Sequence, residues 1–471
     1  MHYLARKLSE EMLKRNEVLI VSHIDADGIA AGSIASGSLT QAGIDHDILF
    51  VKSLDDDAAG RILERSPEFV WFTDIGAGSY NLISEIPGII TDHHVPSESF
   101  AGGDRGRLLP PIRGKGPNML NPHMYGLDGS LDLSGAGVTY ILAKEMNSEN
   151  VRLSGLAIVG AVGDMQDQNH RRLIGSNRKI LSDAEEHGSV RIDTDIRYFG
   201  RETRPVPRLL KYSTDPLLPG LNGNHSACVT FLEEIGIPVK AGDDWRCWSD
   251  LSSSEKQRLV SALVTLLLES GLGREHIERI VGECYTLVQE KEKSVLRDAK
   301  EFATLLNSCG RYDKAGIGME ICLGNREERL DEALNLLRTH RGYLVESLKV
   351  AADTGIIELD HLQYFHGGTR IKDTVIGITA GILMSSPEID KSRPLFAFAH
   401  SDEGVKVSAR ATKTLVSRGL DLSVVMREAA ETTGGAGGGH NVAAGATIPY
   451  NREEEFLELA QNIIMNQMRP E

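Results

Sequence analysis

The chain has 471 residues, of which 41% are hydrophobic and 25% are charged, and its formal net charge at pH 7 is −16. This length predicts two or three domains, each able to bury its own core. No apolar run approaches the ~18 residues that a membrane span needs, and no signal peptide is evident. The five cysteines lack paired spacing, which favours neither a disulfide framework nor a zinc site. We therefore expect a cytoplasmic protein that does not contact a membrane.

The acidic balance argues against a uniformly basic nucleic-acid surface, but a nuclease that holds metal ions must itself carry carboxylates. Basic residues gather in two places, Arg171, Arg172, Arg178 and Lys179, and Arg201, Arg204, Arg208 and Lys211. Each cluster fits a local binding surface and a solvated face about equally well.

The first hundred residues alternate short apolar runs with helix-like stretches. The runs are VLIVS (18–22), DILFV (47–51), FVWFT (69–73) and GII (88–90). Short apolar runs bounded by turn signals predict buried strands, and their alternation with helices predicts a parallel α/β sheet. Ligands of such sheets bind outside the carboxyl ends of the strands.

The segment HIDADG ends the first of these runs with His23, Asp25 and Asp27 on alternate positions. If the chain stays extended there, the three side chains share one face. An Asp before a helix is more commonly an N-cap, so Asp25 has that alternative.

Metal-binding residue types follow two further strands and one more apolar stretch. Asp74 follows the third run, Asp92, His93 and His94 follow the fourth, and Asp164 ends the stretch SGLAIVGAVG (154–163). Their arrival at one sheet edge predicts an oxygen-rich site with one or two imidazoles, which suits Mn²⁺ or Mg²⁺ better than a thiolate-bound metal.

The middle of the chain, residues 186–345, has a mostly helical pattern. Helical periodicity covers 250–271, 275–288, 294–310 and 330–355, with a cap expected at 252–254. This insertion is a packing scaffold, a clamp over single-stranded substrate or a docking face for a partner. Trp245 and Trp248 are more commonly packing residues than base-stacking platforms.

The ordered motifs HIDADG, TDIG, TDHH and VGD, followed by VKVSARAT (405–412) and GGAGGGHNVAAGATIP (434–449), resemble the DHH phosphoesterase superfamily with its DHHA1 domain. Within it, the chain resembles the archaeal RecJ-like exonucleases. The resemblance implies an α/β fold with a parallel-sheet DHH domain (1–185), the helical insertion (186–345) and a smaller α/β DHHA1 domain (346–471) that forms a cleft with the first.

The same resemblance implies two divalent metal ions, with Mn²⁺ preferred and Mg²⁺ as the alternative. Asp25 and His23 would bind the first ion, Asp27, His93 and Asp164 the second, and Asp74 both. His94 would contact the scissile phosphate and Asp92 would orient a histidine, so Asp74, Asp92 and His94 form the expected catalytic set. Bacterial RecJ tends to have Asp where this chain has His23.

In the C-terminal domain the resemblance implies a site for the terminal nucleotide and its phosphate. Its expected members are Ser408, Arg410, His440, the glycine loop Gly437, Gly438 and Gly439, and Arg370. Glycine-rich backbone can present N–H groups to an anion without side-chain bulk.

The implied function is an exonuclease that releases mononucleotides from single-stranded DNA or RNA, with GINS and the replicative helicase as candidate partners. Three alternatives stay open. The first is a phosphodiesterase for oligoribonucleotides, cyclic dinucleotides or adenosine bisphosphate. The second is a replication scaffold without chemistry, and the third is an inorganic pyrophosphatase.

Overall fold

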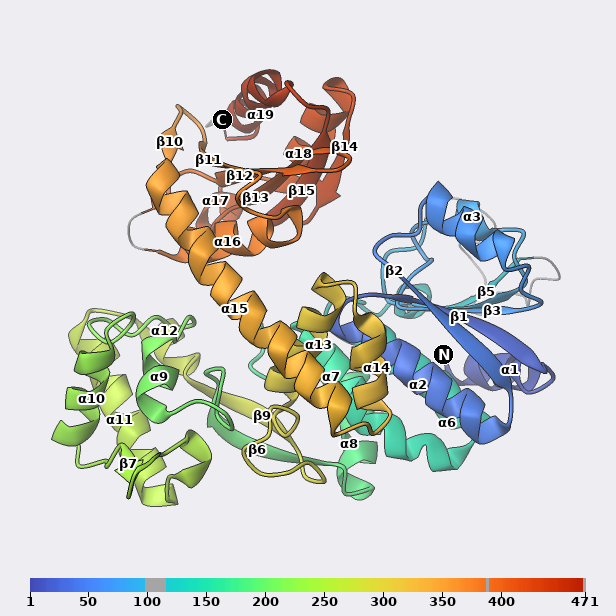
Figure 1. Cartoon of the computed structure of the whole chain (residues 1–471), viewed down its shortest axis with the longest axis horizontal. Coiled ribbons are helices and arrows are strands. Elements are labelled where there is room, and N and C mark those ends of the chain that lie inside the picture. The colour runs from blue at the N-terminus through green and yellow to red at the C-terminus, as the bar shows by residue number, and fades with distance from the viewer. Residues whose placement is uncertain (98–115, 387–388, 469–471) are drawn as a thin grey trace. The chain divides into compact units, whose positions relative to one another are not determined.

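The computed structural model describes residues 1–97, 116–386 and 389–468, which form two compact units, Met1–Leu337 and Arg338–Glu471 (Figure 1). Across these described residues, no helix is both long and apolar enough to cross a membrane. Residues 186–337 of the predicted insertion fall within the first unit, and the division into three domains stays a prediction.

Unit 1 contains a five-stranded sheet in which every neighbouring pair of strands is parallel. Its order is β2-β1-β3-β4-β5, with bounds Asp45–Val51, Glu17–His23, Val70–Thr73, Gly88–Thr91 and Asn118–Leu120. The four strands predicted from the apolar runs are confirmed. Because the chain order reverses between β1 and β3, a ligand crevice is expected at the carboxyl ends of these two strands.

Both faces of this sheet are covered by helices, as its alternating sequence requires. Leu19, Val21 and Phe72 pack on one face with α3 (Asp56–Glu64) and α4 (Tyr80–Ile83). Val18, Ile20 and Trp71 pack on the other face, in the core that contains α1 (His2–Met12), α2 (Ala26–Ala42), α6 (Gly135–Met146) and α7 (Ser154–Gly163). Two short 3₁₀ helices, Pro122–Tyr125 and Ser148–Leu153, flank α6.

Helix α2 is buried along most of its length, and its small residues permit this. A Cβ at Gly28 would lie 2.3 Å from the carbonyl oxygen of His23, and one at Gly32 would lie 2.9 Å from Cδ1 of Ile48. The glycines therefore let the helix turn back directly against β1 and β2.

The insertion follows α8 (Asn177–Glu186) and grows from a two-stranded antiparallel ribbon, β6 (Val190–Ile196) with β9 (Val281–Leu287), which Figure 1 shows beside its helices. Between the two strands lie α9 (Val206–Lys211), α10 (His225–Glu234), β7 (Lys240–Ala241), β8 (Asp244–Trp245), the 3₁₀ helix Trp248–Asp250, α11 (Ser253–Glu269) and α12 (Arg274–Glu278). Ser252 caps α11 in a capping box with Glu255, as the expected cap at 252–254 requires.

The helix predicted over 275–288 is wrong, because only α12 is helical there and residues 281–287 form β9. The ladder with β6 supplies the backbone hydrogen bonds and overrides the helical pattern. Trp248 is buried and its indole N–H donates to Asp195, which fits a packing residue, whereas Trp245 is 42% exposed.

After β9 come α13 (Ala299–Arg311), α14 (Ala315–Cys322) and α15 (Glu328–Thr354). The first turn of α13 packs through buried polar contacts on the segment that follows β6. Asp298 caps the helix and accepts from Arg201, while Glu301 accepts from the backbone N–H of Glu202 and the hydroxyl of Thr203. Arg201, one of the basic cluster, is therefore a buried structural residue rather than part of a binding surface.

Unit 2 holds a six-stranded mixed sheet of order β10-β11-β12-β13-β15-β14, with bounds Ile357–Glu358, Gln363–Gly368, Leu395–Ser401, Gly404–Arg410, Ala443–Ile448 and Ala436–Gly439. One face packs in a core with α16 (Asp373–Ser385) and the last turns of α15. The other face packs with α17 (Lys413–Ser417), α18 (Leu422–Thr432) and α19 (Glu453–Gln467). This is the small α/β domain that the sequence predicted.

Glu301 should make stability depend on pH. Burial, and secondarily the Asp298 carboxylate, raises its pKa to about 7. The folded state then binds this proton more tightly than the unfolded chain does, so stability is greatest at low pH and falls as pH rises through about 7. Glu301→Gln should flatten the fall in thermal midpoint between pH 5 and pH 8, removing an effect of about 1–3 kcal/mol. An unchanged pH dependence in the variant would contradict this assignment.

Candidate metal centre

The β1–α2 connection brings three polar side chains to the switch between β1 and β3. His23 is the last residue of β1, Asp25 is the N-cap of α2, and Asp27 lies in the first turn of that helix. The chain does not stay extended through HIDADG, so the expected common face is wrong. The Asp25 carboxylate accepts from the backbone N–H of Gly28 at 2.9 Å, and this cap starts the helix before Asp27.

Asp74 follows β3 with a left-handed φ of 56°, which is uncommon for a residue other than glycine. Its backbone N–H donates to Thr91 at 2.8 Å, which fixes the turn beside β4. The side chain is 1% exposed and lies between two imidazoles, 3.7 Å from Nδ1 of His23 and 3.3 Å from Nε2 of His93. Asp74 thus lies between His23, at the end of β1, and His93, which follows β4.

Asp92 organises the turn after β4. One carboxylate oxygen accepts from the backbone N–H groups of His93 and His94 and from Nδ1 of His94, and the other accepts from Ala77. Although burial alone would lower it, the hydrogen bond to Asp92 raises the pKa of His94 to about 9. The ring of His94 is half exposed.

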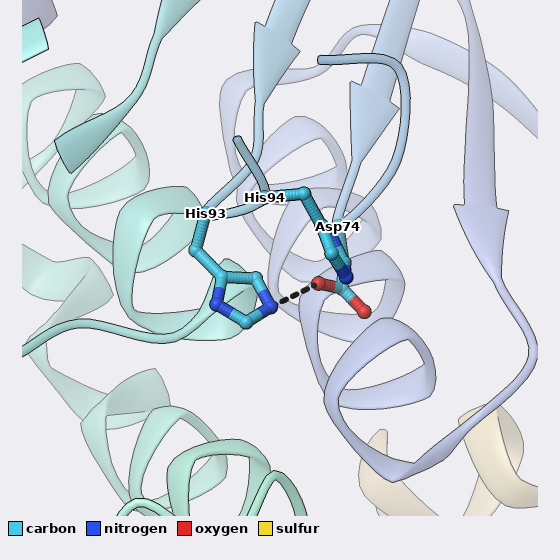
Figure 2. A group of neighbouring side chains, drawn as sticks. All are labelled: Asp74, His93 and His94. Atoms are coloured by element: carbon cyan, nitrogen blue, oxygen red, sulfur yellow. Dashed lines mark ion pairs between the residues drawn. The ribbon is translucent and has the colours of Figure 1, made fainter. Parts of the chain in front are cut away.

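The ring of His93 is oriented by the carbonyl of Gly129, 2.7 Å from its Nδ1. Because a carbonyl only accepts, Nδ1 carries a ring proton, which leaves Nε2 as the ring atom that would bind a cation. Figure 2 shows His93 and Asp74 pointing toward one another, with Nε2 facing Oδ1 at 3.3 Å.

The side chains form three overlapping groups in which the possible ligand atoms all lie within 4.8 Å of one another. The groups are His23, Asp25 and Asp74; Asp27, His93 and Asp164; and Asp74, His93 and His94. The structure therefore brings together every residue that the sequence analysis placed in the metal centre. Their role as ligands remains a prediction.

The charge in this cluster fits bound cations. Burial, together with the Asp74 carboxylate, raises the pKa of Asp27 well above its usual range, and burial raises that of Asp164 to about 6. Asp74 Oδ1 and His23 Nδ1 are buried without an aligned hydrogen bond among the described residues. An unpaired buried carboxylate oxygen is costly, and a divalent cation removes that cost.

Several supporting residues escaped the sequence analysis. The N–H groups of Gly135 and Ala136, which open α6, donate to the two oxygens of Asp27 at 2.7 and 3.1 Å. A Cβ at Gly135 would lie 2.3 Å from Oδ1 of Asp74. The segment SGAG (134–137) carries the only usable signal, a capping Ser followed by small residues.

Gln166 supports two of the expected ligands at once. Its amide donates to the carbonyl of Gly129, beneath His93, and to Oδ2 of Asp164, both at 2.9 Å. Asn177 in turn donates to its side-chain oxygen at 2.7 Å. A buried glutamine in a turn has no sequence signature, so only the fold reveals it.

The last turns of α13, which lie far along the chain from the HIDADG loop, pack against that loop. Asn307 accepts from the backbone N–H of Ala26 at 3.0 Å, and a Cβ at Gly310 would lie 1.8 Å from the carbonyl oxygen of Ile24. Arg311 places its guanidinium near Asp25, whose charge opposes the lowering of the Arg311 pKa by burial.

In unit 2, Ser408 and Arg410 lie on the face of β13 that α16 covers. A Cβ at Gly377 of α16 would lie 2.8 Å from Nη2 of Arg410 and 3.0 Å from Oγ of Ser408. Within the described residues, the Arg410 guanidinium donates only to the carbonyl of Ala409. The structure therefore brings these two predicted residues together and leaves guanidinium donors available.

The expected glycine loop is wrong in its conformation. Gly437, Gly438 and Gly439 belong to β14, an edge strand paired with β15, and exposed His440 follows it. A Cβ at Gly437 would lie 2.3 Å from the carbonyl oxygen of Met426 in α18, so close helix packing explains this glycine. Ser408 of β13 pairs with Gly445 of β15, which pairs with Gly438 of β14. The two residues next to Ser408 across the sheet in this direction therefore have no side chains.

Arg370 lies apart from this group. It is in the turn after β11, beyond the register pair Gly368–Ala399, whereas Arg410 pairs with Leu395 at the other end of β12. Its guanidinium donates to Thr354 of α15 at 2.7 Å.

Comparison with known proteins gives two domain families and one relative along nearly the whole chain. Residues 198–281 match the DHH-CID domain and residues 362–466 match the DHHA1 domain. An uncharacterised protein of Methanocaldococcus jannaschii is 30% identical over 460 residues, which cover 96% of this chain and 94% of that protein.

Solved structures share the fold at lower identity. RecJ of Thermus thermophilus in complex with Mn²⁺ is 17% identical with a TM-score of 0.59, and the match covers 100% of this chain but 55% of that one. CDC45 of Entamoeba histolytica is 12% identical with a TM-score of 0.65, and 98% of both chains is covered. The chain spans about half the length of that RecJ. It belongs to the DHH/DHHA1 family and has its phosphoesterase fold, similar to RecJ and CDC45.

Proposed function

We propose that the protein is a metal-dependent phosphodiesterase, and specifically an exonuclease that releases mononucleotides from an end of single-stranded DNA or RNA. The observation that carries this is the position of buried Asp74 at the switch between β1 and β3, where it groups with His23 and Asp25 and also lies 3.3 Å from His93, a member of the second group. A carboxylate shared by two ions is what a two-metal phosphodiesterase needs.

His23, Asp25 and Asp74 would hold one divalent ion, and Asp27, His93 and Asp164 would hold the other, with Asp74 shared. Two such ions supply a nucleophilic hydroxide and offset the charge that develops on phosphorus. The chain's own residues do the positioning. Asp92 fixes the ring of His94 and raises its pKa, which favours the protonated ring that can donate to a phosphate oxygen.

Unit 2 is proposed to hold the terminal nucleotide of the same strand. Arg410 can bind its phosphate, and Ser408 and His440 can donate hydrogen bonds to it. The glycine row beside Ser408 leaves room for the sugar and base. An end-binding site of this kind favours an exonuclease over an endonuclease.

Two alternatives make different predictions. A phosphodiesterase for short oligonucleotides or cyclic dinucleotides would need no insertion, whereas this chain devotes residues 198–281 to a recognised domain. A replication scaffold without chemistry would not need the full ligand set, which is intact here. A cytoplasmic location and association with GINS and the replicative helicase remain predictions, and the likeness to CDC45 motivates testing them.

The decisive assay uses end-labelled single-stranded DNA and RNA with Mn²⁺, Mg²⁺ or EDTA. Asp74→Asn keeps the side-chain shape but weakens both ion sites, so it should lower the rate of mononucleotide release by at least about a hundredfold. Asp57→Asn, at an exposed position of α3, is the matched control. Near wild-type turnover in the Asp74 variant would refute the shared-ligand assignment.

Gln166→Ala should weaken Mn²⁺ binding by about 10–100-fold, because it loosens His93 and Asp164 together. Gln168→Ala changes an exposed residue of the same turn and should leave the affinity unchanged. Titration calorimetry with Mn²⁺ measures both. Equal affinities for the two variants would show that Gln166 does not support the ligands.

Arg410→Ala should raise KM for single strands by about 10–100-fold with little effect on Mn²⁺ affinity, because it removes a charged donor to phosphate. Arg418→Ala removes an exposed charge from the same unit and controls for net charge. A fall in metal affinity without a change in KM would reverse the roles assigned to the two units.

A further inference from the structure

A second group of metal-binding side chains lies in unit 2, away from every residue given a role above. His366 of β11, His400 of β12 and Glu453, the first residue of α19, bring one ligand atom each within 4.8 Å of the others. The two histidines lie near the carboxyl ends of adjacent parallel strands, and the first turn of α19 supplies the carboxylate.

The strand alternation places this group on the opposite face of the sheet from Ser408 and Arg410. His400 shares its face with Phe396 and Phe398, which pack with α18 and α19, whereas Ser408 and Arg410 face α16. His400 also pairs with Val405, at the opposite end of β13 from Arg410. The group is therefore separate from the proposed nucleotide site.

The distances suit a coordinated cation better than a direct contact. Nε2 of His366 lies 3.8 Å from Oε1 of Glu453, which is too long for a hydrogen bond. Two ligand atoms at about 2.1 Å from a tetrahedral ion lie roughly 3.4 Å apart, so a small movement closes the site. All three residues are partly exposed, which leaves a path for the ion and for a water ligand.

The rings are already oriented by aromatic neighbours. His366 stacks on Phe398 with ring centroids 5.5 Å apart, and His400 meets Tyr450 edge-on at 5.5 Å. The backbone N–H of Gly368 donates to Nδ1 of His366, so a neutral ring carries its proton on Nε2. Coordination through Nε2 would move this proton to Nδ1 and replace the hydrogen bond from Gly368 by the metal ligand.

We propose that His366, His400 and Glu453 form a binding site for a divalent transition metal of the Zn²⁺ class, which ties β11 and β12 to the start of α19. Two imidazoles, one carboxylate and a water are a ligand set that favours Zn²⁺ over Mn²⁺. The oxygen-rich centre in unit 1 differs in this respect, so the two sites should prefer different metals.

The test counts Zn²⁺ bound to the full chain by equilibrium dialysis with Mn²⁺ in excess, so that the centre in unit 1 is occupied by Mn²⁺. Wild type should retain one Zn²⁺ more than His400→Ala, and Glu453→Gln should bind that ion at least about tenfold more weakly. His361→Ala, an exposed histidine of the same unit, should behave as wild type.

Co²⁺ absorption provides a second readout, because a four-coordinate site gives strong visible bands that His400→Ala should remove. Mn²⁺-dependent cleavage should be unchanged in this variant, which separates this site from the proposed exonuclease centre. Equal Zn²⁺ binding by wild type, His400→Ala and Glu453→Gln would overturn the proposal. If His400→Ala fails to fold, Glu453→Gln at the edge of the helix alone decides it.

Discussion

Asp27 and Asp74 are buried residues, and buried ionised carboxylates persist only where donors or cations surround them. Unit 1 supplies part of that compensation. The helix N-terminus at Gly135 and Ala136 donates twice to Asp27, where the positive end of the helix dipole adds to the effect. Asp74 Oδ1 has no aligned donor in the described part of the chain, and this remaining charge is what two cations would neutralise.

This constraint explains features of the sheet and helices around it. Glycines stand at two of the closest approaches to the buried carboxylates. A Cβ at Gly135 or at Gly160 would lie 2.3 Å from an oxygen of Asp74 or of Asp27. Close packing of α6 and α7 against α2 therefore shapes the centre as much as the ligands themselves do. Helix α13 connects this centre with the segment after β6. Its first turn accepts from the backbone N–H of Glu202 through Glu301, and its last turns contact the HIDADG loop through Asn307.

The strands that end at His23, Thr73 and Thr91 could be predicted from the sequence, because short apolar runs and parallel-sheet geometry place their carboxyl ends together. The backbone conformation within and between the motifs could not be predicted from the sequence. The chain at Asp25 forms a helix cap and does not stay extended, because the carboxylate accepts from the backbone N–H of Gly28. Residues 281–287 form β9 and not the expected helix, because their backbone pairs with β6. The glycines at 437–439 predict a loop, but they form an edge strand that packs against α18. Gln166 and Asn307 are single polar residues that contact Gly129 and Ala26, 37 and 281 residues away in the sequence, so no local pattern could reveal these contacts.

Electron paramagnetic resonance of the full chain titrated with Mn²⁺ tests the shared role of Asp74 most directly. If Asp74 joins two ions, the spectrum should develop the signature of a spin-coupled Mn²⁺ pair as the second equivalent binds, since ions about 3.5–4 Å apart interact strongly. A spectrum that shows only isolated Mn²⁺ at saturation, with no coupled component, would contradict a two-metal centre built on Asp74.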